Sequence, residues 1–416
     1  MTESVLVIGN PGAGDGTGPA FLEQHVLPLL KASNLSYDFR KTSSAEEAGE
    51  LIRAHTARST LPIVLAGGDG TVHDALNYIY LKEVVEGAGD STSIPALSLI
   101  LVPTGTANAL YNSVWPPSTA ESKGRHPLLP EDTAPETTYK LHSVLAFLDA
   151  YKSQKETSSS ATSGRPIAIA LAETFNPSAP SDPSSAPAPT KAILSCVVNS
   201  TSLHAGILHT AEKYRASMPG IERFKVAAQD NILNWSRAHV ELVPPLGEAS
   251  VLKYDPSTKQ LSPSQEENGK LDGPFFYFLS TINVDRLEPQ FVTTPLAQTA
   301  PPPDGAALDV VVVRPAHKPG YTGDSEESRK AFVDVVMAWF GAVYSNGTHL
   351  DHKYPESEVF MTEYYRVGGW KWFPQGSDEF SRLVCVDGTV LNIPEGGHAE
   401  VKVVPLGGKA KLQLWA

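Results

Sequence analysis

Residues 61–71 read Leu-Pro-Ile-Val-Leu-Ala-Gly-Gly-Asp-Gly-Thr and give the clearest indication of how this chain folds. The apolar run 61–66 predicts a buried β-strand, and the glycines directly after it predict a tight turn. Residues 72–86 have the character of a helix, so the turn lies between a strand and a helix N-terminus. This order is typical of parallel α/β folds, in which ligands bind at the carboxyl ends of the strands.

The same turn is a candidate phosphate-binding site. Gly67, Gly68 and Gly70 have no Cβ atoms, so backbone N–H groups can approach phosphate oxygens closely, and the helix that follows adds a favourable dipole. Asp69 presents a carboxylate in this turn and is our candidate for a general base that accepts the proton of a hydroxyl nucleophile. A strand-to-helix turn that binds no ligand is the alternative interpretation.

Two further glycine turns follow strand-like runs near the start of the chain. Residues 9–16 read Gly-Asn-Pro-Gly-Ala-Gly-Asp-Gly, but Asp15-Gly16 stands where a Walker loop requires Lys and then Ser or Thr, and the dinucleotide-binding pattern fails as well. Residues 103–108 read Pro-Thr-Gly-Thr-Ala-Asn and combine backbone donors with two hydroxyls and an amide. This third turn either binds phosphate or caps the next helix. All three turns should line one crevice of the sheet.

We predict two domains that meet at about residue 150. Strand-like runs alternate with helix-like stretches over residues 1–150, which predicts a parallel α/β nucleotide-binding domain. Short β-branched and aromatic runs over residues 151–416 predict an antiparallel β-sandwich, with disordered insertions at about 153–164 and 176–190. A helix predicted over residues 329–344 either packs on the sandwich core or presents its aromatic side to lipid.

Composition narrows the class of protein. The chain has 416 residues, of which 33 are basic and 46 acidic, and a formal net charge of −13. This charge disfavours partners bound through broad electrostatics, so we expect no nucleic acid partner. Cys196 and Cys385 have apolar or β-branched neighbours and are expected to be buried, reduced thiols. The chain shows neither a signal-like N-terminus nor an apolar run of about 18 residues, which predicts a cytoplasmic or peripheral protein.

The motifs together resemble the diacylglycerol kinase catalytic-domain superfamily. Asn10-Pro11, Gly67-Gly68-Asp69-Gly70-Thr71 and Pro103-Thr104-Gly105-Thr106-Ala107-Asn108 occur in the order of that superfamily. Glu212-Lys213-Tyr214-Arg215 and Val384-Cys385-Val386-Asp387-Gly388 are similar to motifs of its sphingosine kinase-like branch. The resemblance implies an α/β nucleotide-binding domain, a β-sandwich lipid-binding domain, and transfer of the ATP γ-phosphoryl group to a hydroxyl of a sphingoid base or diacylglycerol-type lipid.

The resemblance also implies roles for individual residues. Asp69 is the expected catalytic base beside the lipid hydroxyl, and the catalytic Mg²⁺ is expected to arrive with ATP. Contacts to the nucleotide are implied for Asn10, Pro11, Gly12, Thr42, Gly67, Gly68, Gly70, Thr71, Asp74, Gly105, Thr106, Ala107, Arg215, Arg223, Asp387 and Gly388. From the residues alone, Arg215 and Arg223 are equally compatible with a solvated helix face on which Glu212 and Glu222 pair with them.

Some positions depart from the family pattern. Gly206 and Leu208 stand where sphingosine kinases carry aspartates, one of which anchors the lipid head group, and Thr389 replaces the glutamate of a late Asp-Gly-Glu motif. His209, beside Leu208, is a candidate contact to a head-group hydroxyl or a structural hydrogen-bonding residue. Asp304 is a candidate ligand of a structural Mg²⁺ like that of bacterial relatives, or part of an ordinary turn.

Three functions are compatible with these observations. The first is an ATP-dependent lipid kinase that uses ATP and Mg²⁺, acts on a lipid substrate and contacts the membrane peripherally. The second is a nucleotide-binding or lipid-binding pseudokinase in a regulatory complex, motivated by Leu208 and Thr389. The third is a kinase of a soluble substrate such as NAD, although the turn at 103–108 and the Val-Asp-Gly motif argue against it.

Overall fold

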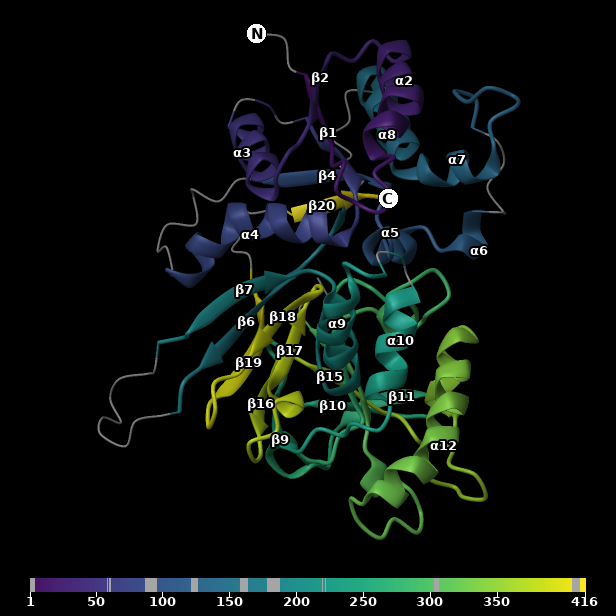
Figure 1. Cartoon of the computed structure of the whole chain (residues 1–416). Helices are drawn as coiled ribbons and strands as arrows, with labels where there is room; N and C mark the ends of the chain where they lie inside the picture. Colours follow the sequence, from purple (N-terminus) through teal and green to yellow (C-terminus); the bar gives the residue numbers. More distant parts are fainter. Residues whose placement is uncertain are drawn as a thin grey trace. The chain divides into compact units, whose positions relative to one another are not determined.

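The computed structural model describes residues 4–57, 59, 61–86, 96–120, 126–157, 164–177, 188–218, 220, 222–302, 307–405 and 412–416. The chain forms two compact units, one made of Met1–Ala168 with Leu406–Ala416 and one made of Ile169–Pro405 (Figure 1). Each unit is described separately below.

The first unit is built on a mostly parallel sheet with the strand order β2-β1-β3-β4-β20-β5. Every neighbouring pair is parallel except β20 and β5, which are antiparallel. The parallel α/β arrangement predicted from the sequence is therefore confirmed. The strands are β1 (Val5–Gly9), β2 (Tyr37–Lys41), β3 (Ile63–Gly67), β4 (Leu97–Pro103), β5 (Gly164–Pro166) and β20 (Leu412–Trp415).

The boundaries of this unit differ from the predicted division at residue 150. That residue lies inside a helix, α8 (His142–Thr157), and the unit continues through β5 to Ala168. The end of the chain was expected to belong to the sandwich, but β20 returns to the first sheet and pairs with β4 and β5. Its side chains Leu412, Leu414 and Trp415 are buried there, which explains why so short a strand joins this sheet.

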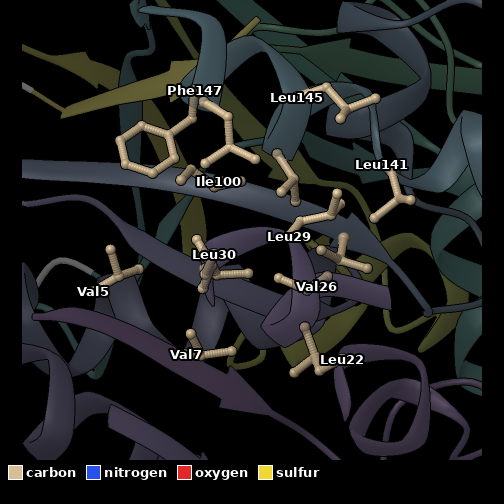
Figure 2. Close-up of a cluster of buried hydrophobic side chains, with 14 of the residues drawn as sticks. Val5, Val7, Leu22, Val26, Leu29, Leu30, Ile100, Leu141, Leu145 and Phe147 are labelled. Carbon is tan, nitrogen blue, oxygen red and sulfur yellow. The ribbon is translucent and has the colours of Figure 1, made fainter. Parts of the chain in front are cut away.

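The helices of the first unit supply one side of its hydrophobic core. Leu22 and Val26 of η1 and Leu29 and Leu30 of α2 pack with Val5 and Val7 of β1, Ile100 of β4, and the α8 side chains Leu145 and Phe147 (Figure 2). The helical segments are α1 (Gly18–Phe21), the π-helical η1 (Leu22–Val26), α2 (Leu27–Ala32), α3 (Ala45–Thr56), α4 (Asp69–Val85), α5 (Ala109–Val114), α6 (Pro117–Ala120), α7 (Pro135–Lys140) and α8.

The structure describes the ends of both segments that were predicted to be disordered insertions. Residues 153–157 form the last turns of α8, and Gly164 begins β5, while residues 158–163 lie outside the described residues. At the second insertion, the N–H of Thr190 donates to the carbonyl oxygen of Thr174 at 2.7 Å, and residues 178–187 lie outside the described residues. The described ends of the first insertion are therefore regular structure, and a backbone hydrogen bond ties the end of the second insertion to β6.

The second unit consists of two antiparallel sheets that pack face to face. Phe278 of the first sheet contacts Trp370 and Trp372 of the second, with ring centroids 5.3 and 5.4 Å apart, and Trp370 Nε1 donates to Ser280 Oγ at 2.9 Å. The expected antiparallel sandwich is present in this unit. The strand orders are β11-β10-β15-β14-β13-β8-β17-β18 and β12-β9-β16-β19-β6-β7.

The strands of the first of these sheets are β8 (Val198–Thr201), β10 (Leu252–Asp255), β11 (Gln260–Pro263), β13 (Tyr277–Thr281), β14 (Leu308–Val313), β15 (Glu363–Val367), β17 (Leu383–Val386) and β18 (Thr389–Asn392). Those of the second are β6 (Ile169–Phe175), β7 (Lys191–Ser195), β9 (Ala238–Val243), β12 (Lys270–Asp272), β16 (Gly369–Pro374) and β19 (His398–Val404). The helical segments of the unit are α9 (Ser202–Tyr214), α10 (Glu222–Asn231), η2 (Glu267–Gly269), α11 (Leu296–Thr299), η4 (Pro315–His317), α12 (Glu326–Tyr344), η5 (Thr348–Asp351) and η6 (Phe380–Arg382).

The aromatic side of α12 belongs to the core of this unit. Phe332 and Trp339 are 2% and 1% exposed and pack against Phe276 and Tyr277. Of the two predicted alternatives, packing on the sandwich core is correct and a lipid-facing aromatic side is wrong, because burial in the core leaves these rings no contact with a membrane. Cys196 and Cys385 are buried free thiols, as expected. Within the described residues, no helix combines the length and apolar character needed to cross a bilayer.

Candidate functional site

The turn after β3 places Asp69 at the start of a long helix. Gly68 has an extended backbone and is the N-cap of α4, whose first residue is Asp69, so the helix begins three residues earlier than predicted. A Cβ atom on Gly67 would lie only 2.4 Å from Thr71 Oγ1, which is too close for any larger residue. The conformation of the turn therefore requires glycine at this position. A Cβ atom on Gly70 would have no neighbour within 4 Å, and Gly70 is exposed. The space above Gly70 is therefore open to a ligand.

The Asp69 carboxylate is held by a second helix. Its Oδ2 accepts the N–H of Ala109 at 2.7 Å and its Oδ1 accepts the N–H of Leu110 at 3.0 Å. These two residues begin α5, whose first N–H groups have no partner within the helix. The carboxylate thus lies where the N-terminal ends of α4 and α5 meet, next to the positive ends of both helix dipoles.

The structure brings the three glycine turns together. A Cβ atom on Gly105 would lie 2.3 Å from the Cα of Gly68, so the second and third turns touch through their backbones. The first turn joins them at Gly14, where a Cβ atom would lie 2.2 Å from the carbonyl oxygen of Thr104. Asn10 Nδ2 also donates to Thr71 Oγ1 at 3.0 Å. The expectation that the turns share one edge of the sheet agrees with these contacts.

Side-chain amides fix the shape of the third turn. Asn108 has a left-handed backbone, with φ at 53°, and its Nδ2 donates to the Gly105 carbonyl while its Oδ1 accepts the Gly105 N–H. Asn112 Nδ2 donates to the Ala107 carbonyl at 2.8 Å, and Asn112 Oδ1 accepts from the Tyr139 hydroxyl. These bonds leave Thr106 exposed at the tip of the turn, where its hydroxyl is accessible.

The remaining nucleotide contacts expected in the first unit lie at or near the same edge. Pro11 and Gly12 are exposed, and the Gly12 N–H donates to Asn10 Oδ1 at 2.8 Å. Thr42 follows β2, is 4% exposed, and donates its N–H to the Gly9 carbonyl at 3.1 Å. Asp74 is exposed on α4, beyond Gly70.

A small recess lies below the Asp69 carboxylate. Its cavity volume is about 10 Å³, far less than the roughly 300 Å³ at which ligand pockets begin. The recess is therefore too small to enclose a nucleotide. The lining residues are Leu65, Gly67, Gly68, Asp69, Val72, Leu101, Pro103, Asn108 and Tyr111.

A larger groove lies in the second unit, between α9, α10 and the β17–β18 hairpin. Its cavity volume is about 340 Å³, at the lower end of the size range of small-molecule sites. It brings together Arg215, Arg223, Leu208, His209 and Gly388, which were singled out from widely separated parts of the sequence. The full lining is Leu208, His209, Ala211, Glu212, Arg215, Arg223, Phe224, Gly388, Thr389 and Val390.

The two arginines of the groove have different partners. Arg215 Nε lies 2.8 Å from both carboxylate oxygens of Glu212, and this hydrogen bonding is the main cause of a lowered pKa of the Glu212 carboxyl. The predicted Arg215–Glu212 pair is therefore present. Glu222 pairs with Lys225 instead of Arg223. The Arg223 guanidinium donates to the Gly220 carbonyl and lies 4.4 Å from the centroid of the Phe224 ring.

Asp387 has a structural set of partners that the sequence motif did not reveal. Asp387 and Gly388 have φ values of 46° and 96°, as in the two-residue turn of a type I′ hairpin between β17 and β18. The Asp387 carboxylate accepts the N–H groups of Cys196, Val197 and Val198 at 2.7, 2.9 and 2.7 Å. The Asp-Gly pair between two apolar runs was a hairpin signal, but nothing local in the sequence pointed to the connection between β7 and β8.

The structure provides no metal cluster within the described part of the chain. No group of three or more His, Cys, Asp or Glu side chains there is arranged to hold a metal ion. The candidate Mg²⁺ ligand Asp304 lies outside the described residues.

Comparison with known proteins agrees with this geometry. Residues 4–129 match the sequence profile of the diacylglycerol kinase catalytic domain, the domain whose motifs its three turns resemble. A segment of 110 residues is 32% identical to human sphingosine kinase 1, covering 26% of this chain and 27% of that protein. A segment of 115 residues is 27% identical to sphingosine kinase 1 of Arabidopsis thaliana, covering 28% of this chain and 22% of that protein.

The fold also has a counterpart among solved structures. A protein of Bacillus anthracis str. Sterne assigned as a diacylglycerol kinase superposes with a TM-score of 0.52 over 99% of this chain and 97% of its own chain. The two sequences are 13% identical, so this likeness concerns the fold alone.

Proposed function

We propose that this chain is an ATP-dependent lipid kinase that transfers the γ-phosphoryl group of ATP to a hydroxyl of a sphingoid base or diacylglycerol-type lipid. The observation that carries this proposal is the position of Asp69. Its carboxylate lies at the first residue of α4 and at the N-terminus of α5, where three glycine turns meet at the carboxyl end of a parallel sheet. Sites of this kind favour phosphate groups, because backbone N–H groups and helix dipoles face them.

Asp69 suits the chemistry that phosphoryl transfer requires. A lipid hydroxyl is a weak nucleophile, and a carboxylate accepts its proton while the new O–P bond forms and the bond to ADP breaks. An ionised carboxylate can accept about four hydrogen bonds, so its bonds to Ala109 and Leu110 are compatible with this role. Bound with ATP, Mg²⁺ would neutralise charge on the phosphates.

The exposed parts of the turns fit a polyphosphate. Gly12, Gly70 and Thr106 are exposed, and the space next to Gly70 contains no protein atom within reach of a Cβ. We assign the phosphate contacts to these positions and to the neighbouring residues of the same turns, namely Asn10, Pro11, Thr42, Gly67, Gly68, Thr71, Asp74, Gly105 and Ala107. On the basis of the family resemblance, we also assign nucleotide contacts in the second unit to Arg215, Arg223, Asp387 and Gly388.

We assign lipid binding to the groove of the second unit. Leu208, Phe224 and Val390 give it apolar walls, and His209 and Thr389 give it polar groups for a head-group hydroxyl. A lipid substrate requires that the protein reach a membrane surface, so we propose a cytoplasmic protein that contacts the membrane peripherally.

A regulatory pseudokinase is the second candidate function. It is favoured by one observation: the Asp387 carboxylate already accepts three backbone N–H groups, while the neighbouring position Thr389 supplies a hydroxyl in place of a carboxylate. In this alternative the turns bind nucleotide but no lipid becomes phosphorylated.

Phosphoryl transfer to a panel of lipids distinguishes the two functions. The full chain is incubated with γ-labelled ATP, Mg²⁺ and mixed micelles that contain sphingosine, ceramide, diacylglycerol or monoacylglycerol, and with NAD as a soluble acceptor. Label on one or more lipids, abolished by EDTA, is the expected result. ATP binding with no label on any acceptor would contradict the lipid kinase and favour the pseudokinase, and label on NAD alone would favour the soluble-substrate kinase.

A further inference from the structure

The three glycine turns contain no positively charged side chain of their own. Residues 9–17, 67–71 and 103–108 include no Lys or Arg, and they include the carboxylates of Asp15 and Asp69. The phosphates of ATP bring further negative charge to the same place, of which Mg²⁺ offsets only a part. A cation from a neighbouring element would therefore favour nucleotide binding at these turns.

The short helix α7 brings such a cation to the first turn. Lys140 is its last residue, and the Nζ atom lies 5.7 Å from the centroid of the Phe21 ring. Phe21 ends α1, the helix that directly follows the first turn. The pKa of the Asp15 carboxyl in this turn is lowered mainly by hydrogen bonds from Thr17 and also by the positive charge of Lys140. The ammonium group is thus close enough to the first turn to act on a charge there.

The neighbours of Lys140 hold it in this position. The hydroxyl of Tyr139 donates to Asn112 Oδ1 at 2.5 Å, and Asn112 Nδ2 in turn donates to the Ala107 carbonyl of the third turn. On the other side, Leu141 is 1% exposed and belongs to the hydrophobic core of the first unit. The end of α7 is therefore tied to the third turn and to the core, while Lys140 reaches across Phe21 to the first turn.

The ion pair that Lys140 forms within α7 is one that a phosphate can replace. Its Nζ lies 2.7 Å from Oε1 of Glu136, one helical turn earlier, and the two side chains are 26% and 78% exposed. Exposed pairs at this spacing contribute little to stability. A phosphate group carries more negative charge than a carboxylate and offers several acceptor oxygens. Exchange of Glu136 for phosphate should therefore be favourable.

We propose that Lys140 contacts the phosphates of the bound nucleotide, so that α7 forms part of the nucleotide site. This inference rests on the proposed function, in which the three turns bind ATP, and it adds a binding residue from outside the turns. The carboxylate of Glu136 competes with phosphate for the same ammonium group. The two members of one ion pair thus have opposite effects on the affinity for ATP.

Calorimetric titration of the full chain with ATP and Mg²⁺ tests the inference. Lys140→Gln should weaken ATP binding by about tenfold, whereas Glu136→Gln should bind ATP at least as tightly as the wild type. Lys140→Arg keeps the charge and should restore most of the affinity lost in Lys140→Gln. Unchanged affinity in Lys140→Gln would overturn the inference. Equal losses in Lys140→Gln and Glu136→Gln would overturn it as well, because both substitutions break the same ion pair within α7.

Lys330→Gln is the matched control. Lys330 pairs with Glu326 at 2.6 Å with the same spacing, in α12, and belongs to none of the glycine turns. This variant should keep the wild-type affinity for ATP. Urea unfolding of Lys140→Gln and Lys330→Gln should give wild-type midpoints, since both ion pairs are exposed. A lower midpoint together with weaker ATP binding in Lys140→Gln, not restored in Lys140→Arg, would assign the loss to the packing of α7 and contradict the contact.

Binding and phosphoryl transfer separate this inference from the proposed function. ATP binding that depends on Lys140, with no label transferred to any lipid, would support the contact and contradict the lipid kinase. Label transfer to a lipid with the same ATP affinity in wild type and Lys140→Gln would support the kinase and contradict the contact. A wild-type chain that binds no ATP would contradict both.

Discussion

The backbones of Gly68 and Gly105 touch so closely that a Cβ atom on Gly105 would lie 2.3 Å from the Cα of Gly68. This contact joins turns that are far apart in the sequence, and it leaves no space for a side chain between them. The Asp69 carboxylate and the N-terminus of α5 are positioned by the same contact, because each directly follows one of the two turns. The relationship between these two glycines therefore sets the geometry of the candidate site.

Substitution of Gly105 should destabilise the first unit. In Gly105→Ala the added methyl group meets backbone atoms, which cannot rotate away, and overpacking of this kind costs about 1 to 3 kcal/mol. Urea unfolding of the variant should show a lower midpoint than that of the wild type. An unchanged midpoint would contradict the close packing of the two turns.

Substitution of Gly70 should have the opposite effect on stability and a large effect on ATP binding. A methyl group on Gly70 meets no protein atom within 4 Å, and Ala is favoured over Gly in a helix by about 0.5 to 1 kcal/mol. Gly70→Ala should therefore fold at least as well as the wild type. If phosphate approaches this backbone, the methyl group should weaken ATP binding at least about tenfold, a change of about 1.4 kcal/mol.

Gly341→Ala is the matched control for Gly70→Ala. Gly341 is likewise an exposed helical glycine, in α12, and a Cβ atom there has no neighbour within 4 Å, but it belongs to none of the glycine turns. Calorimetric titration with ATP and Mg²⁺ should give a wild-type affinity for Gly341→Ala. Wild-type affinity in Gly70→Ala as well would remove this turn from the nucleotide site.

Replacement of Asp387 should act mainly on folding. In Asp387→Asn, one carboxylate oxygen becomes an NH₂ group that faces backbone N–H donors, and an unsatisfied buried donor costs about 1 to 3 kcal/mol. The free energy of unfolding of the second unit should fall by that amount, while Thr389→Ala at the neighbouring exposed position should change it little. A variant that unfolds like the wild type but loses ATP affinity would show that Asp387 binds the nucleotide directly.

The second unit should lose stability in acid because of His349. This side chain is fully buried beside Trp339, and burial lowers its pKa to about 4 from 6.5. The unfolded chain therefore takes up a proton at His349 below about pH 6.5, whereas the folded chain does so only below about pH 4. Stability falls as the pH decreases through that window, by about 1 to 2 kcal/mol between pH 7.5 and 5.

Urea unfolding at several pH values checks this contribution. In His349→Leu, which keeps an apolar side chain in the core, the loss of stability between pH 7.5 and 5 should be smaller than in the wild type by about that amount. Between pH 7.5 and 9 the two proteins should change in parallel, since His349 is neutral in both states there. An identical acid dependence in wild type and variant would contradict the assignment.

The sequence predicted correctly those features that depend on a short, continuous segment of the chain. The apolar run 61–66 followed by Gly-Gly-Asp-Gly predicted β3, its turn and the helix after it, because strand burial and turn chemistry are local properties. The meeting of the three turns was also predictable, since the carboxyl ends of parallel strands share one edge of a sheet.

The partners of individual side chains were not predictable in this way. Asp69 accepts hydrogen bonds from residues 40 and 41 positions away, and Asp387 from residues about 190 positions away. The strand β20 has only four residues, of which Leu412, Leu414 and Trp415 are buried. So short an apolar pattern is compatible with either sheet of the sandwich and with the parallel sheet that β20 joins. Tertiary packing decides such cases, and it leaves no local signature.

The most direct test of the account compares Asp69→Asn with Asn112→Ala in the lipid phosphorylation assay. Both variants weaken the third turn, because Asn at position 69 loses an acceptor for the N–H groups of α5 and Ala at position 112 loses the bond to the Ala107 carbonyl. Removal of a general base lowers turnover by about 10² to 10⁴. We predict a loss of that size in Asp69→Asn, with ATP still bound, and a loss below about tenfold in Asn112→Ala. Turnover in Asp69→Asn equal to that of Asn112→Ala would contradict a catalytic role for Asp69.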